Sequence, residues 1–90
     1  MFEFDPAKSE ANLTKHGIDF EAAQALWQEA VFAEGPTNSS GEERWMRVAM
    51  AAEKLWAAIF TVRDGRIRLI SVRRARANEA KQYDSKVDQR

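Results

Sequence analysis

The order of apolar and polar positions at the start of the chain predicts a short strand followed by two helices. Residues 2–4 alternate apolar, acidic and apolar, as a strand does. Asp5 and Pro6 suit the N-cap and first turn of a helix, and Gly17 suits its left-handed C-cap. Asp19 is placed to cap a second helix. The apolar positions of that helix recur at helical spacing: Phe20, Ala23, Leu26 and Trp27. Two short helices separated by a glycine predict a helical hairpin or corner.

The middle of the chain has the pattern of an antiparallel sheet. Residues 30–33 suit a brief extended segment, and the polar run 35–41 suits a loop. Three strand-like runs follow: 44–52, 55–63 and 66–72. Glu53-Lys54 is expected to turn the first hairpin. Asp64-Gly65 is a favoured turn pair and is expected to turn the second.

The last strand-like run alternates in an informative way. Ile67 and Leu69 are expected to face one side, and Arg66 and Arg68 the other, with Ile70 and Val72 continuing on that second side. The arginines of this run are therefore expected to stand on one face of the sheet.

The end of the chain, 73–86, returns to helical composition, with Ala75, Glu79 and Tyr83 on one ridge. The element order predicts an α+β fold with a short N-terminal strand, two helices, an antiparallel β-meander and a C-terminal helix. The whole chain, 1–90, is expected to form one domain, since two separate cores of this size are each marginal.

Composition predicts a small core and argues against several classes of protein. Hydrophobic residues make up 44% of the chain, with three Trp and five Phe, which is unlike a disordered chain. The absence of cysteine excludes a disulfide framework and a thiolate zinc site and fits a cytoplasmic location. Residues 1–6 carry two acids and no apolar run, so no signal peptide is expected. No phosphate-binding loop or metal-spaced cluster is present, so we expect no cofactor, no metal and no membrane association.

The formal net charge of zero hides a separation of charge along the chain. Residues 1–43 contain two Lys and nine acidic residues, whereas residues 44–90 contain twelve basic and five acidic residues, so the halves carry −7 and +7. Six arginines fall between Arg63 and Arg76, opposed only by Asp64. Because a planar guanidinium matches phosphate geometry well, this segment predicts a phosphate-binding face.

Three segments together resemble the BrnT family of toxins: Phe2–Ala22, the GEERW segment Gly41–Trp45, and FTVRDGRIRLISVRRA, Phe60–Ala75. The resemblance implies a RelE-like ribonuclease fold, RNA cleavage that halts translation, and neutralisation by a BrnA antitoxin. It also implies that the antitoxin binds DNA and represses the shared operon. The family commonly has a glutamate at the position of Val62, so this chain lacks whatever that carboxylate contributes.

Arginines are the first candidates for the chemistry of RNA cleavage. Attack of a 2′-hydroxyl on the adjacent phosphate gathers negative charge in the transition state, which fixed guanidinium groups stabilise. The four arginines expected to converge on that phosphate are Arg63, Arg68, Arg73 and Arg74. Further RNA contacts are expected from Lys15, Arg66 and Arg76. The alternative is a solvated basic face, or arginines paired with acids of this chain or of a partner.

Proton transfer is expected of His16, the only histidine, or of Glu43 or Tyr83 in its place. The structural alternatives are that His16 completes a helix end, Glu43 is merely exposed at the start of a strand, and Tyr83 anchors the last helix on the sheet. Trp45 is a candidate for stacking on an RNA base or, alternatively, for covering the sheet. Glu79 is expected to be an ion-pair partner of an arginine.

The sequence therefore predicts a metal-independent endoribonuclease that acts on messenger RNA and is held silent by a BrnA-like antitoxin, with DNA contacted only through that antitoxin. Two other interpretations stay open. One is a non-catalytic RNA- or ribosome-binding module with a basic arginine face. The other is a structural or regulatory protein whose basic face docks an acidic partner.

Overall fold

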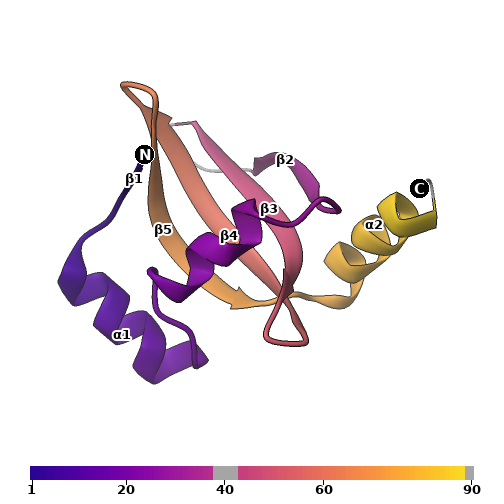
Figure 1. Ribbon diagram of the computed structural model, residues 1–90, viewed down its shortest axis with the longest axis horizontal. Helices are drawn as coiled ribbons and strands as arrows, with labels where there is room; N and C mark the ends of the chain where they lie inside the picture. Colours follow the sequence, from indigo (N-terminus) through magenta and orange to yellow (C-terminus); the bar gives the residue numbers. More distant parts are fainter. Residues whose placement is uncertain (38–42, 89–90) are drawn as a thin grey trace.

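The structure of the protein is a computed structural model, and it describes residues 1–37 and 43–88. One five-stranded sheet runs through the molecule, in the order β1-β5-β4-β3-β2 (Figure 1). The elements in chain order are β1 (Phe2–Glu3), α1 (Pro6–His16), the 3₁₀ helix η1 (Ala22–Trp27), β2 (Ala33–Thr37), β3 (Arg44–Ala51), β4 (Lys54–Arg63), β5 (Arg66–Arg74) and α2 (Ala77–Asp88). The α+β class predicted from the sequence is confirmed.

The sheet is mixed, which corrects the expectation of an antiparallel meander. Strands β2 to β5 pair antiparallel with their neighbours. β1 instead pairs in parallel with β5, with Phe2 beside Ile67 and Glu3 beside Arg68. Two alternating residues carry no information about which distant strand they join or in which direction, so this pairing was not predictable from the local pattern.

The first helix begins and ends where the sequence predicts. The Asp5 carboxylate accepts a hydrogen bond from the Ala7 N–H at 2.9 Å, and Pro6 lies in the first turn. Gly17 adopts φ 84° as the C-cap, and its N–H donates to the Leu13 carbonyl. A side chain at this φ is strained, which explains the glycine.

The second predicted helix is a 3₁₀ helix, which corrects the expected α-helix. The Asp19 carboxylate accepts from the Ala22 N–H at 2.8 Å, so the cap is present. The buried residues Phe20, Ala23 and Leu26 recur every three positions. This spacing matches the three residues per turn of a 3₁₀ helix and places all three side chains on the sheet.

β2 extends into the polar run that was expected to be a loop. Its five residues pair with β3 from Ala33 beside Val48 to Thr37 beside Arg44. Pro36 is tolerated because β2 lies at an edge of the sheet. The remainder of the predicted loop, including Gly41 and Glu42 of the GEERW segment, lies outside the described residues.

Of the two hairpin turns, the first lies one residue earlier than predicted and the second lies where it was predicted. Ala51 pairs with Lys54, so the first turn is Ala52-Glu53 rather than Glu53-Lys54. Both turn residues adopt positive φ, 50° and 64°, although neither is glycine. The second turn is Asp64-Gly65, as predicted, with Arg63 paired to Arg66.

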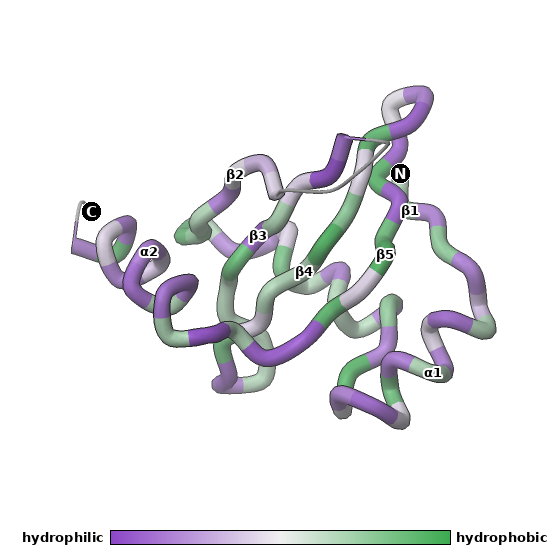
Figure 2. Tube along the Cα trace, turned by 180° about the vertical axis from the view of Figure 1, so that it is seen from behind, coloured by the Kyte–Doolittle hydropathy of each residue, from purple (hydrophilic) through white to green (hydrophobic). Residues whose placement is uncertain are grey.

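The two faces of the sheet have different coverings. The front face is the side on which α1 and η1 pack (Figure 1), and its core includes residues from η1, β4 and β5, namely Leu26, Ala58, Phe60, Leu69 and Val72. The opposite side is called the open face. There a smaller buried cluster of Ala33, Val48 and Ala57 packs against Tyr83 of α2. Figure 2 views the molecule from behind and shows α2 at the side of the sheet that β2 and β3 form.

A β-bulge in β5 changes which side chains share a face. Two neighbouring residues of β4 pair with Leu69 and Ser71, which leaves Ile70 as the extra residue. Val72 therefore belongs to the front-face core together with Leu69. This corrects the expectation that Val72 shares the face of the preceding arginines.

Candidate nucleic-acid interface

A row of polar and charged residues crosses the open face. Strand pairing places Thr37 beside Arg44 on β2 and β3. The register of β3 and β4 brings Arg44 next to Thr61, which pairs with Arg68. Paired residues point to the same side of a sheet, so two guanidinium groups flank one threonine. On β1, Glu3 is the neighbour of Arg68. We call these five residues the arginine row: Thr37, Arg44, Thr61, Arg68 and Glu3.

Arg44 has the least satisfied guanidinium of the arginine row. Its Nε is buried and has no hydrogen-bond partner among the described residues. A buried donor without an acceptor costs about 1–3 kcal/mol, so an acceptor that reached this nitrogen would stabilise the position. Arg44 was not among the residues predicted from the sequence, because it lies apart from the cluster at 63–76. The signal in the sequence that could have found it is the alternation of Arg44 with Met46 and Val48, which places the three side chains on the same face of the strand.

Arg68 and Thr61 are held in place by contacts that leave Arg68 accessible. The Arg68 Nη1 donates to Glu3 Oε2 at 3.0 Å, and the two side chains are 35% and 30% exposed. The Thr61 hydroxyl donates to the Glu43 carbonyl at 2.7 Å and is buried. Because a guanidinium has five N–H donors, the ion pair with Glu3 leaves most of them available for another acceptor.

Arg73 lies on the open face but is engaged by a carboxylate. Its two terminal nitrogens donate to the two oxygens of Glu79 at 2.8 and 2.9 Å. Glu79 also accepts from the Arg76 N–H at 2.8 Å and so caps the start of α2. The hydrogen bonds with Arg73 lower the pKa of the Glu79 carboxyl, and those with Glu79 raise the pKa of Arg73. The expected role of Glu79 as an ion-pair partner is confirmed.

Arg74 lies on the front face, so the expected convergence of four arginines on one phosphate is wrong. Its guanidinium stands 5.7 Å from the ring centre of Trp56, a member of the front-face core. The bulge at Ile70 is the cause: it places Arg73, rather than Arg74, on the same side as Arg68. Side chains of consecutive strand residues point to opposite faces, so Arg73 and Arg74 cannot both serve one site.

The remaining arginines of the cluster lie around the ends of β5. Arg63 and Arg66 pair with each other beside the Asp64-Gly65 turn, and the strand alternation places both on the open face. Arg76 precedes α2 and is exposed. These residues therefore extend the basic surface beyond the arginine row without meeting at a single point.

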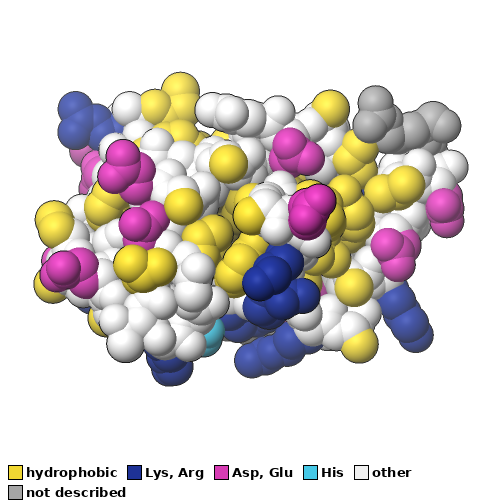
Figure 3. Space-filling view, turned by 60° about the horizontal axis from the view of Figure 1, so that its bottom comes forward, with side chains coloured by type: hydrophobic (Ala, Val, Ile, Leu, Met, Phe, Trp, Pro, Cys, Tyr) yellow, Lys and Arg dark blue, Asp and Glu magenta, His cyan; other side chains and the backbone are white. Residues whose placement is uncertain are grey.

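His16 and Lys15 lie in the last turn of α1, on the front side of the sheet. Asn12 ties this helix to β5 at Val72. Figure 1 shows that the last turn of α1, which contains His16 and Lys15, lies toward the carboxyl end of β5. Figure 3 shows the histidine in cyan beside lysine and arginine side chains. His16 is half-buried, and Lys15 is exposed. Neither residue belongs to the arginine row.

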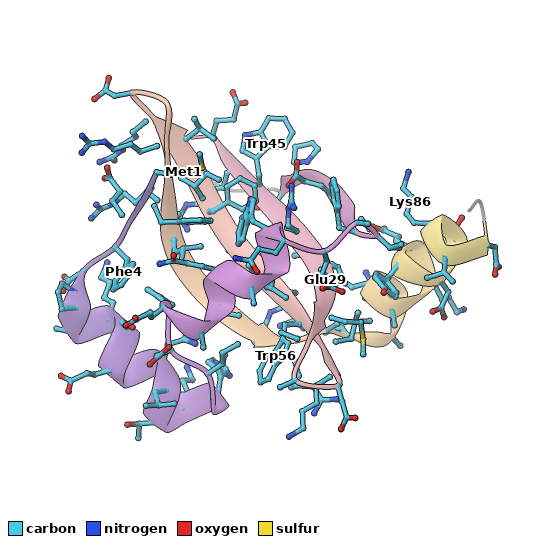
Figure 4. The ribbon with its side chains drawn as sticks, viewed as in Figure 1. Met1, Phe4, Glu29, Trp45, Trp56 and Lys86 are labelled. Atoms are coloured by element: carbon cyan, nitrogen blue, oxygen red, sulfur yellow. The ribbon has the colours of Figure 1, made fainter. Side chains whose placement is uncertain are left out.

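Trp45 and Glu43 line a hollow on the front face, together with Phe60, Val62 and Glu34. The volume of the hollow is about 350 Å³. Trp45 lies at the opposite end of the sheet from Trp56 (Figure 4). Val62 is 55% exposed there, so a glutamate at this position would belong to the hollow and not to the arginine row.

Tyr83 anchors α2 on the open face by packing against the cluster of Ala33, Val48 and Ala57. This is the structural role that was expected of Tyr83 as the alternative to a catalytic one. Of the three residues proposed for proton transfer, Tyr83 is the one whose side chain packs on the same face as the arginine row.

Residues 1–37 and 43–88 contain no group of three or more histidine, aspartate or glutamate side chains placed to hold a metal ion. None of the helices in this part of the chain has the length and apolar character needed to cross a membrane.

The architecture defines a small α+β protein with a mixed sheet whose open face carries arginines. A family model described as "Ribonuclease toxin, BrnT, of type II toxin-antitoxin system" matches residues 4–79 of the 90-residue chain. The chain therefore belongs to the BrnT family, which confirms the resemblance found in the sequence. Membership implies an RNA target and a protein antitoxin as partner. Comparison with curated proteins gave no match.

Proposed function

We propose that the chain is a metal-independent endoribonuclease that cleaves messenger RNA, thereby halts translation, and is neutralised by a BrnA-like antitoxin. The fold would then be RelE-like, as the family resemblance implies. Family membership supports ribonuclease activity and a protein antitoxin. The observation that carries the site is the arginine row, in which the buried, unpartnered Nε of Arg44 and the accessible Arg68 flank Thr61.

Arg44 and Arg68 hold the scissile phosphate in this proposal. Both groups are oriented before RNA binds, Arg44 by burial in the sheet and Arg68 by its contact with Glu3. Donors fixed in advance stabilise the charge that develops on phosphate oxygens without further reorganisation. The exposed Arg66 at the hairpin extends the path for the RNA backbone. Arg73 contributes through Glu79 to the position of α2.

Proton transfer is assigned to Tyr83, because its side chain packs on the open face whereas Glu43 lines the front-face hollow. His16 belongs to α1 on the front side. The variants Tyr83→Phe, Glu43→Gln and His16→Asn separate the three residues. Only the loss of the tyrosine hydroxyl is expected to lower the cleavage rate strongly, without weakening RNA binding.

Cleavage of labelled RNA in excess EDTA tests the proposal. Wild-type protein is expected to produce discrete fragments with 2′,3′-cyclic phosphate ends. Replacing Arg44 or Arg68 by alanine is expected to lower the rate about 100-fold, the typical loss when one fixed donor is removed from an oxyanion. Arg44→Lys keeps the charge but removes Nε, so it is expected to stay slow.

The matched control is Lys86→Ala, which removes a positive charge from the far end of α2 (Figure 4). It is expected to cut RNA at the wild-type rate, and circular dichroism checks that each variant is folded. RNA binding without products contradicts the enzyme and favours the non-catalytic RNA-binding module. Equal activity of Arg44→Ala, Arg68→Ala and wild type contradicts the arginine row as the site.

A further inference from the structure

A groove on the open face lies between α2 and the strands β2 and β3. Its volume is about 190 Å³, smaller than the front-face hollow. Residues from three elements line it, among them Thr37, Met46, Val48, Asn78, Glu79 and Gln82. None of the proposed phosphate contacts lies in this groove.

The groove has an apolar floor and an amide rim. Val48 is buried and Met46 is half-buried on the strand side. Asn78 and Gln82 lie four residues apart on α2, so they share one face of the helix. Both are exposed, and neither amide has a hydrogen-bond partner within the described part of the chain. A groove with apolar side chains at its floor and free amide donors and acceptors at its rim suits a nucleobase.

Charge favours a neutral ligand over a phosphate in the groove. Two carboxylates border it, and each is already paired with an arginine. Glu79 is engaged by Arg73, and Glu34 accepts from the Arg47 Nε at 2.7 Å. A carboxylate that is paired with an arginine still repels an anion that comes closer to it than the arginine does. An uncharged base meets no such barrier.

The groove is placed beside the arginine row. Its wall residue Thr37 pairs directly with Arg44. At the other end, its wall residue Glu79 holds Arg73. A nucleotide whose phosphate contacts Arg44 therefore has its base within the reach of the groove.

We propose that this groove binds one unstacked RNA base next to the phosphate held by Arg44, and that Asn78 and Gln82 read its hydrogen-bonding edge. The inference rests on the proposed function and adds a residue-level basis for sequence preference. Arg44 supplies affinity that is independent of sequence, and the two amides supply discrimination between bases.

The test measures binding of labelled RNA hexanucleotides of uridine in which one central position is A, C, G or U. Wild-type protein is expected to distinguish the best from the worst base by about five- to tenfold, the lower end of the discrimination typical of one well-formed base contact. Asn78→Ala and Gln82→Ala are expected to reduce this ratio below about twofold while the mean affinity changes little. Alanine is a good helix former, so both variants are expected to keep α2 intact.

Two controls separate this inference from the proposed function. Ser85→Ala removes another exposed polar group from α2 outside the groove and is expected to keep the wild-type ratio. Arg44→Ala is expected to weaken all four hexanucleotides alike. A ratio near one for wild type, or an unchanged ratio in both amide variants, overturns the base groove while phosphate binding stands. Failure of wild type to bind any hexanucleotide overturns the proposed function as well.

Discussion

Asn12 occupies a position on the edge of β5 that β1 is too short to reach. β1 pairs with β5 only at Ile67 and Arg68. Further along, the Asn12 amide accepts from the Val72 N–H at 3.2 Å and donates to the Val72 carbonyl at 2.8 Å. The same amide group donates to the Ile18 carbonyl at 2.8 Å. One side chain thus replaces a peptide group of the missing strand and fixes α1 against the sheet.

Replacing Asn12 by leucine is expected to lower the free energy of unfolding by about 2–4 kcal/mol, because buried backbone groups at Val72 and Ile18 lose their partners. Asn12→Asp keeps the shape but removes the donors and is expected to cost a comparable amount. Urea unfolding followed by tryptophan fluorescence measures both. The exposed Thr14→Ala on the same helix is the control, and an Asn12→Leu midpoint equal to that of the control contradicts this account.

The Arg73–Glu79 pair makes the stability of α2 dependent on pH. Its side chains are 19% and 7% exposed. Because the folded pKa of Glu79 is lowered from its ordinary value of 4.5, the pair contributes its full stabilisation above that value and loses it as pH falls through the folded pKa. Glu79→Gln is expected to cost about 3 kcal/mol at pH 7, because it leaves Arg73 without a counter-charge.

The difference in unfolding free energy between wild type and Glu79→Gln is expected to shrink below pH 4.5. Denaturant titrations from pH 7 to pH 3 measure it. The difference isolates Glu79 because all other acids are common to both proteins. A difference that stays constant across this range would show that the charge of Glu79 does not stabilise the fold.

At the scale of elements, the features that depend on neighbours in sequence were predicted, and those that depend on distant pairing were not. The cap at Asp5, the stop at Gly17 and the Asp64-Gly65 turn each follow from a few adjacent residues. The pairing of β1 with β5 and the extension of β2 are decided by strands far away in the chain. Local composition therefore identified α1 and the long strands, but not the edges of the sheet.

The bulge in β5 shows why the candidate site was only partly predictable. Ile70 lies among residues that all suit a strand, so nothing in the local pattern marks it as extra. A single unpaired residue exchanges the faces of Arg73 and Arg74. The composition of the cluster indicated arginine chemistry, whereas the choice between Arg73 and Arg74, and the neighbours of Arg44 across the sheet, required the register of the sheet.

At the scale of the whole molecule, the charge separation in the sequence becomes a separation between the two sides of the sheet. Exposed acids such as Glu10 and Glu21 lie in or next to α1 and η1, which pack on the front face. Arg44, Arg66 and Arg68 lie on the open face. Figure 3 likewise shows most basic side chains along the lower side of the view and most acidic ones above. A protein of zero net charge therefore presents a positive surface in one direction.

This separation predicts that the salt dependence of RNA binding follows the arginines and not the net charge. Each phosphate contact on single-stranded RNA contributes about 0.7 to the slope of log affinity against log salt. Arg68→Ala removes one phosphate contact and one charge, so the magnitude of its slope is expected to decrease by about 0.7. The double variant Glu10→Lys, Glu21→Lys raises the net charge by four, two at each position, but on the front side. Its slope is expected to stay within about 0.3 of wild type, since counterions are released only where phosphates bind.

Fluorescence anisotropy of a labelled RNA between 50 and 300 mM salt measures all three proteins. A steeper slope in the double variant, together with an unchanged slope in Arg68→Ala, would mean that RNA responds to the overall charge. The open face would then not be the binding surface.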